Sequence, residues 1–312
     1  MDNREASIPF AFWRFLHPRY IGPWFTLFVL RLLALLPYSA LLGIGRALGR
    51  FIVWSGISRA HIMDINLRLC FPDKSDDERA EIRGLSYQNI AISLMETAMC
   101  WWWSDRRLRR LVTIEGLEHV HEALKLGKGV ILVTGHFTSL EIGGRLFSLY
   151  APLQAMYRTQ PNKLFDSFLT MQRERYLTQM IPRQRTRQLL RGLKANLPTW
   201  YAPDQNFTRE RNVFAPFMGI PAATIVAGAR IAKVSGAPML PFFPQRNEDG
   251  SGYTLIIDPP LENFPCGDDL QDATRINQSI EKYLYQYPSQ YIWSHKRFKN
   301  RPEGEADLYR QS

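Results

Sequence analysis

The residues best suited to do chemistry are a histidine and a glutamate, His136 and Glu141, five positions apart in the run GHFTSLE that begins at Gly135. They come directly after the apolar residues 130–134. Ligands of open α/β sheets gather beyond the carboxyl ends of strands, which is where His136 would fall. Five residues of continuous helix would place the two side chains on different faces. We therefore expect His136 in the turn before a helix and Glu141 in its early turns, with Thr138 or Ser139 as the cap.

In that arrangement His136 would act as a general base. The Glu141 carboxylate could reach back to one imidazole nitrogen, fix the tautomer and stabilise the imidazolium. The chain has no Gly-x-Ser-x-Gly nucleophile elbow, and its cysteines have no obvious histidine partner in the sequence. A base without its own nucleophile suits activation of a substrate hydroxyl, and so direct acyl transfer without an acyl-enzyme. The spacing also fits a histidine that is hydrogen-bonded structurally at a strand end.

We expect neither a metal nor another cofactor at this site, because no second His or Cys stands at ligand spacing to His136. The three cysteines, Cys70, Cys100 and Cys266, are far apart in the sequence. Their odd number argues against a disulfide framework and favours a reducing compartment.

The charge of the chain favours acidic partners, with a formal net charge of +10 and a pI of about 9.6. Between Arg173 and Lys194 there are seven basic residues against one acid, Glu174. Phosphate groups, sugar acids or an acidic carrier protein would each be attracted to such a stretch. A solvated basic surface is the simpler alternative. The chain carries no recognised nucleic-acid-binding motif, so we expect no nucleic acid partner.

The N-terminal part indicates association with a membrane. Arg31 is the only charged residue from Ile21 to Gly45, a segment that exceeds the roughly 20 apolar residues that a spanning helix needs. A central Arg costs ~2.5–3.5 kcal/mol on insertion, and Pro37 would kink or end the helix. A spanning helix, an interfacial helix with Arg31 reaching to the headgroups, and a buried core helix therefore all stay open. The basic residues that follow favour a cytoplasmic location for the rest.

The remaining chain predicts an α/β sheet covered by helices on both faces, because strands alternate with helices. A helical region covers about 60–110, and its Trp101–Trp103 and basic residues 106–110 fit either a membrane-docking patch or a core with a charged rim. Gly143 and Gly144 would let the helix after His136 pack closely on the sheet or on a substrate chain. We expect residues 1–50 to form an anchor with its flanks and 51–312 one catalytic domain. The predicted strands are 112–116, 129–135, 153–158, 199–204, 238–244 and 253–259, and the predicted helices are 138–149, 163–195, 222–235 and 272–287.

Motifs along nearly the whole chain resemble those of the lipid A late acyltransferases, the lauroyl/myristoyl/palmitoleoyl acyltransferase family of lipopolysaccharide biosynthesis. A His-x4-Asp/Glu motif alone is shared with glycerolipid acyltransferases, whereas the other motifs together are much more specific. They are FLHPRY (15–20), NLRLCFPDKSDDER (66–79), LMETAMCWWW (94–103), HFTSLE (136–141), MYRTQPNKL (156–164), WYAPDQNF (200–207) and WSHKRFKNRPEG (293–304).

The resemblance implies a fold like that of glycerolipid acyltransferases, with a central mixed sheet. It implies a catalytic dyad of His136 and Glu141, with the family's required Arg and Asp matching Arg173 and Asp204. Arg158 is a further candidate for binding a phosphate or headgroup. We expect these last three residues to contact substrate.

The resemblance also implies the substrates and the location. The donor would be an acyl carrier protein thioester, and the acceptor a hydroxyl on a 3-hydroxyacyl chain of a Kdo-bearing lipid A precursor. The enzyme would act among membrane lipids at the cytoplasmic side of the inner membrane. Two rivals stay open: the same fold acting on a glycerophosphate or glycolipid acceptor, and a non-catalytic adaptor at the membrane surface.

Overall fold

The protein is built around a seven-stranded sheet with the strand order β1-β9-β8-β2-β5-β3-β4. The computed structural model describes residues 9–56, 60–206 and 211–310. Among the neighbouring strand pairs of this sheet, only β8 and β9 are antiparallel, so the sheet is mixed, as expected. The strands are β1 (Val112–Glu115), β2 (Val130–Val133), β3 (Gln154–Tyr157), β4 (Gln179–Pro182), β5 (Pro198–Tyr201), β8 (Met239–Arg246) and β9 (Tyr253–Ile257).

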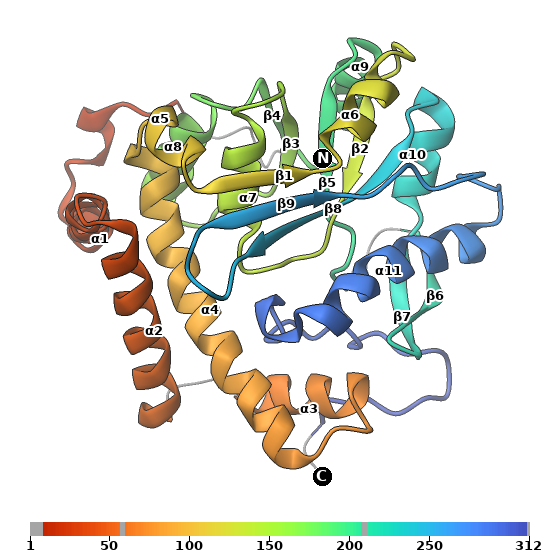
Figure 1. Ribbon diagram of the computed structural model, residues 1–312, viewed down its shortest axis with the longest axis horizontal. Helices are drawn as coiled ribbons and strands as arrows, with labels where there is room; N and C mark the ends of the chain where they lie inside the picture. The colour runs from red at the N-terminus through yellow and green to blue at the C-terminus, as the bar shows by residue number, and fades with distance from the viewer. Residues whose placement is uncertain (1–8, 57–59, 207–210, 311–312) are drawn as a thin grey trace.

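Helices cover both faces of this sheet (Figure 1). In β2, Val130 and Leu132 pack in one core cluster, while Ile131 and Val133 pack in the other. All four side chains are buried, which explains why this strand is a continuous apolar run. The first cluster contains residues of α4 (Asp76–Trp102), α6 (Leu117–Leu124), α7 (Leu140–Phe147) and α8 (Lys163–Arg173). The second contains residues of α3 (Ala60–Cys70), α9 (Thr186–Lys194), α10 (Ala227–Ser235) and α11 (Asp269–Gln286).

The predicted elements fail at two places. The region 163–195 is not all helical, because β4 separates α8 from α9. The predicted helix 222–235 begins too early, since β6 (Asn212–Phe217) and β7 (Ile220–Ile225) form a hairpin before α10. Met218 and Gly219 connect the two strands with positive φ values of 50° and 80°, the backbone of a tight hairpin turn.

The N-terminal apolar segment folds as two helices, α1 (Ile21–Leu33) and α2 (Tyr38–Ser55). Pro37 separates them with an extended backbone, since its ring cannot continue a helix. Within the described residues, none of the helices is by itself long and apolar enough to cross a bilayer. Only α2 and α3 together pass that test by length and composition, as a pair bent by 100°.

Helix α2 packs along α4 rather than standing apart from the body (Figure 1). Its Gly45 and Gly49 lie against the α4 backbone at Ile92 and Gln88, where a Cβ would overlap. The predicted boundary at residue 50 falls inside α2. The division into an anchor and a catalytic domain stays a prediction.

The tryptophans at the end of α4 pack in or against the core, as expected for a core with a charged rim. Trp101 and Trp103 are buried, and Trp102 is half-buried against the core. The indole of Trp103 donates a hydrogen bond to the Ala34 carbonyl at 2.7 Å, and Trp101 packs edge-on against Phe168. Arg107 of α5 (Asp105–Arg109) lies over the Trp103 ring at 3.3 Å.

Candidate active site

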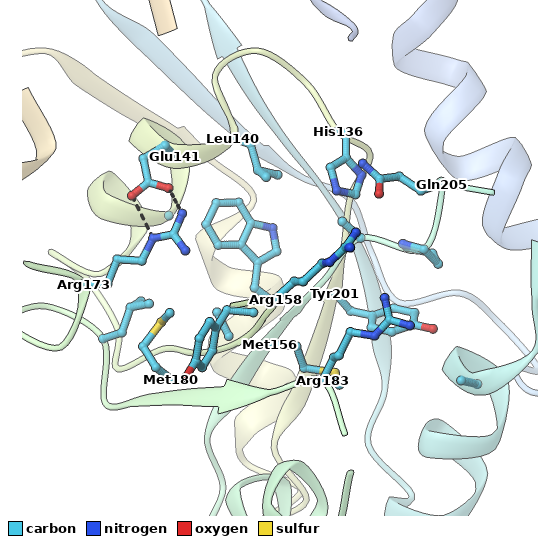
Figure 2. A pocket seen from close by; sticks show the side chains of 18 of the residues that line it. His136, Leu140, Glu141, Met156, Arg158, Arg173, Met180, Arg183, Tyr201 and Gln205 are labelled. Atoms are coloured by element: carbon cyan, nitrogen blue, oxygen red, sulfur yellow. Dashed lines mark hydrogen bonds and ion pairs between the residues drawn. The ribbon is translucent and has the colours of Figure 1, made fainter. Parts of the chain in front are cut away.

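The candidate site is a cavity of about 440 Å³ beyond the carboxyl ends of β2, β3 and β5 (Figure 2). Its lining combines apolar side chains with charged ones. Four of the predicted site residues line it, and these are His136, Glu141, Arg158 and Arg173. The fifth, Asp204, is fully buried beside His136.

His136 lies in the loop between β2 and α7, as expected, and it is held by Asp204 rather than by Glu141. Its Nδ1 lies 2.5 Å from one Asp204 oxygen, and its backbone N–H donates to the other at 2.8 Å. The sheet register explains why His136 and Asp204 lie close together, because Val133 pairs with Tyr201 on the neighbouring parallel strand. His136 and Asp204 each stand three residues beyond that pair.

The predicted hydrogen bond between Glu141 and His136 is therefore wrong. Glu141 sits in the first turn of α7 and its carboxylate points towards α8, where it binds Arg173 through two guanidinium nitrogens, with Nε–Oε1 at 3.0 Å. The hydroxyl of Tyr176 donates to the same oxygen at 3.1 Å. Figure 2 shows this ion pair on the side of the cavity away from His136. Asp204, expected to contact substrate, binds His136.

The electrostatics make His136 and Asp204 a coupled pair. Burial alone would raise the pKa of Asp204, but the charge and hydrogen bonds of His136 and the hydroxyl of Tyr291 lower that pKa to about 2. Burial alone would lower the pKa of His136, yet Asp204 raises it above its usual value. An imidazolium formed during proton transfer is thus stabilised by an ionised carboxylate.

Glu141 and Arg173 form a second charged pair. Burial would raise the pKa of Glu141, but the charge and hydrogen bonds of Arg173 and the hydroxyl of Tyr176 hold it below its usual value. Burial would lower the pKa of Arg173, and Glu141 raises it. Both side chains are therefore charged at neutral pH.

Helix α7 packs tightly against the sheet through Gly143 and Gly144, which confirms the prediction that these glycines allow close packing on the sheet. A Cβ at Gly143 would overlap Pro244 of β8, and one at Gly144 would overlap the ring of Trp200 of β5. Trp200 itself lines the cavity. Ser139 takes the N-cap position, but its hydroxyl bonds the Pro244 carbonyl instead of capping the helix.

Several residues of the site were not identified as site residues from the sequence. Tyr176 follows α8, Trp200 of the motif WYAPDQNF lies on β5, and Arg183 of the basic stretch 173–194 precedes α9. All three line the cavity. In Figure 2, Arg158 and Arg183 lie on the His136 side of the cavity. Tyr291, which donates to Asp204 at 2.7 Å, comes from the segment after α11.

Residues 9–300 match the family model described as bacterial lipid A biosynthesis acyltransferase. The chain is 39% identical to the Escherichia coli lipid A biosynthesis palmitoleoyltransferase, over 95% of this chain and 96% of the relative. It is 37% identical to the E. coli lauroyltransferase, with 94% and 96% covered, and 28% identical to the E. coli myristoyltransferase, with 99% and 96% covered. His136 of the matching motif lines the cavity described above. Because the match extends over nearly the full length, this chain belongs to the bacterial lipid A biosynthesis acyltransferase family.

Proposed function

We propose that this protein transfers a fatty acyl chain from an acyl carrier protein thioester to a hydroxyl on a 3-hydroxyacyl chain of a Kdo-bearing lipid A precursor. The observation that carries the proposal is His136, which lines the cavity while its Nδ1 is held by the buried Asp204. The family supports lipid A acylation, since relatives of similar length are named for it.

The transfer would proceed directly, without an acyl-enzyme. Asp204 holds the Nδ1–H of His136, so Nε2 is left to take the proton of the acceptor hydroxyl. The acceptor oxygen attacks the thioester carbonyl and forms a tetrahedral intermediate. Its collapse breaks the carbon–sulfur bond, and the departing thiolate takes the proton from the imidazolium. Nε2 returns neutral, and the products are an ester and the free carrier thiol.

Glu141 supports this reaction through Arg173 in our proposal. The two-point contact orients the guanidinium in the cavity wall. There it presents a fixed donor to an anionic group of the acceptor. Arg158 and Arg183, on the other side of the cavity, would bind further phosphate or carboxylate groups.

The acyl tail would occupy the apolar part of the same cavity. Leu140 comes from α7, Met156 from β3 and Met180 from β4, and all three line it. Trp200 adds an aromatic wall. An apolar cavity with charged groups at its edges suits a long hydrocarbon attached to a polar reacting end.

The carrier protein would dock on the basic face of α9. The first residue of this helix, Thr186, lines the cavity, so the helix starts at the site. Its Arg187, Arg191 and Lys194 are exposed and recur at helical spacing. No acidic residue occurs between Glu174 and Asp204. Such a surface complements an acidic protein.

We further propose that the protein acts at the cytoplasmic face of the inner membrane and contacts lipid through α1. Ile21, Phe25, Phe28 and Leu32 recur on one face of this helix and are 48–67% exposed. A face of this kind suits a helix lying in the membrane interface. Arg31 is also exposed, so its charge can reach the headgroups. Figure 1 shows α1 and α9 at widely separated places on the molecule, which leaves α9 open to a soluble partner.

Mass spectrometry of the lipid product tests the proposed reaction. Membranes that carry the wild type or His136→Ala would receive carrier thioesters of several chain lengths and the tetraacylated Kdo-bearing precursor. We expect one added acyl group with the wild type and a loss of ~10²–10⁴-fold in the variant, the usual range for a general base. No added group from any donor would reject the lipid A acceptor, and product masses from glycerophosphate or glycolipid acceptors would identify the first rival. Equal activity in both proteins would reject His136 as the base.

A further inference from the structure

The segment after α11 contacts the proposed base from a direction that the reaction scheme has not used. The Tyr291 hydroxyl donates a 2.7 Å hydrogen bond to the Asp204 oxygen that also accepts from the His136 backbone. Burial, and then the charge of Asp204, raise the pKa of Tyr291 well above its ordinary value. The hydroxyl therefore stays protonated and can only donate to a carboxylate.

The backbone around Tyr291 is paired with the loop that carries His136. Tyr291 forms an isolated antiparallel bridge with Phe137. The Thr138 N–H donates to the Gln290 carbonyl at 2.7 Å, and the Ile292 N–H donates to the His136 carbonyl at 3.1 Å. The loop is thus bonded to this segment on both sides of the bridge.

The segment is itself fastened to the sheet and to α4. The Gln290 amide accepts from the Arg246 N–H at 2.9 Å and donates to the Arg246 carbonyl at 2.8 Å, at the end of β8. The Asn89 side chain of α4 donates to the Ser289 carbonyl at 2.9 Å. The Tyr291 ring packs on Phe137, with ring centroids 5.6 Å apart. Few degrees of freedom remain for the hydroxyl.

We propose that Tyr291 is a positioning residue for the acyl transfer: its hydroxyl fixes the Asp204 carboxylate, while its backbone bridge fixes the His136 loop. This inference rests on the proposed function, because it assumes that His136 is the base. Tyr291 acts through Asp204 and need not touch substrate.

Removing the hydroxyl has a predictable electrostatic effect. In Tyr291→Phe the ring still packs, but Asp204 loses one of the three donors that contact it among the described residues. Its negative charge is then less dispersed and attracts the imidazolium more strongly, so the pKa of His136 should rise. At neutral pH a smaller fraction of the base is unprotonated, and the carboxylate is less well oriented.

Other titratable groups near the pair should stay as they are. On the C-terminal side these are His295, whose pKa burial lowers, and Arg297, and both interact electrostatically with Asp204. The Glu141–Arg173 pair and Arg158 line the cavity. None of these described groups hydrogen-bonds the Tyr291 hydroxyl, so a change in the pKa of His136 can be ascribed to loss of that hydroxyl.

Acyl-transfer rates as a function of pH, for the full chain in vesicles, provide the first test. For Tyr291→Phe we expect kcat to fall about tenfold, a fraction of a general base's contribution, with the thioester KM unchanged. The midpoint of the alkaline rise in kcat/KM should move to higher pH. The matched control is Tyr309→Phe, which removes a buried hydroxyl that donates to Asn66 at 2.6 Å, away from the site. It should leave midpoint and kcat unchanged.

A proton NMR titration of the His136 imidazole, assigned by its loss in His136→Gln, provides a test that needs no activity. A higher pKa of His136 in Tyr291→Phe alone would support control of His136 by the Tyr291 hydroxyl through Asp204, whichever acceptor is acylated. The absence of a lipid product with the wild type would instead reject the acceptor of the proposed function. A His136 titration in Tyr291→Phe that matches the wild type would overturn the proposed role of Tyr291. So would an equal shift in Tyr309→Phe, because the effect would then come from general loosening of the C-terminal segment.

Discussion

The contact between Asp204 and His136 is the one on which the proposed acyl transfer depends most. In Asp204→Asn an amide can no longer stabilise the imidazolium, and its NH2 group can face Nδ1 and favour the wrong tautomer. We expect kcat to fall by ~10³–10⁴-fold, as for other histidine bases that lose their carboxylate. The control is Asp272→Asn, a buried aspartate that accepts from the Cys266 N–H and lies outside the cavity. Near-normal transfer by Asp204→Asn would contradict the role of Asp204.

The Glu141–Arg173 pair can be separated from the base by a double-mutant cycle. If Glu141 acts only by orienting Arg173, then Glu141→Gln, Arg173→Gln and the double variant should lose similar transfer activity, because all break one unit. If Glu141 instead assists His136 independently, the two losses in free energy of activation should add. Steady-state rates of the four proteins decide between these outcomes.

The same pair predicts a pH dependence of stability. The pKa of Glu141 is lower in the folded protein than its ordinary value of 4.5, mainly because Arg173 outweighs burial. Its contribution to the free energy of unfolding is therefore fully present above pH 4.5 and is lost as the pH falls through the folded pKa. The wild type should lose stability in that window, and a Glu141→Gln/Arg173→Met protein should lose less. Urea unfolding at several pH values measures this difference, and equal slopes would contradict it.

At the scale of elements, α9 makes a prediction about the donor. Reversing Arg187, Arg191 and Lys194 to Glu should raise the KM for a carrier-protein thioester at least tenfold and weaken its salt dependence, since rim charges chiefly govern encounter. The KM for an acyl-pantetheine thioester, which lacks the acidic protein, should not change. Reversal of exposed Arg106 and Arg110 serves as the control. Equal effects on both donors would reject docking on α9.

The elements show what the sequence can and cannot predict. Strand β2 was predictable because both its faces are buried, so its apolar run is continuous. Strand β4 has four residues and owes its conformation to pairing with β3, a contact that the local sequence pattern does not predict. The β6–β7 hairpin lies where a helix was expected, and its turn required a positive φ at Met218, which is uncommon for that residue.

The site was predictable in part of its residues but not in its pairing. His136, Glu141, Arg158 and Arg173 all line the cavity. The partner of His136 is determined by the register of β2 on β5, which only the fold provides. Glu141, five residues from His136 in the chain, does not contact the imidazole, whereas Asp204, three residues beyond the end of the neighbouring strand, does.

The whole molecule presents an apolar helix, α1, and a basic helix, α9, on distant parts of its surface (Figure 1). Replacing Phe25 and Phe28 by Ser should weaken binding to anionic vesicles about tenfold or more, since a buried Phe contributes ~1.5–3 kcal/mol. Val234→Ser on α10, which is 72% exposed, is the control and should bind as the wild type does. Vesicle co-sedimentation measures the change. Undiminished binding by the Phe25/Phe28 variant would locate the lipid contact elsewhere.

The segment 290–292 has a consequence for the order in which the site comes into being. It follows every strand of the seven-stranded sheet in the sequence, so the ribosome delivers it after the cavity walls and after His136 itself. A chain released before residue 290 would contain the residues that line the cavity but neither the bridge to Phe137 nor the tyrosine that donates to Asp204. We expect such incomplete translation products to be catalytically silent, so that acylation begins only once synthesis has passed this point.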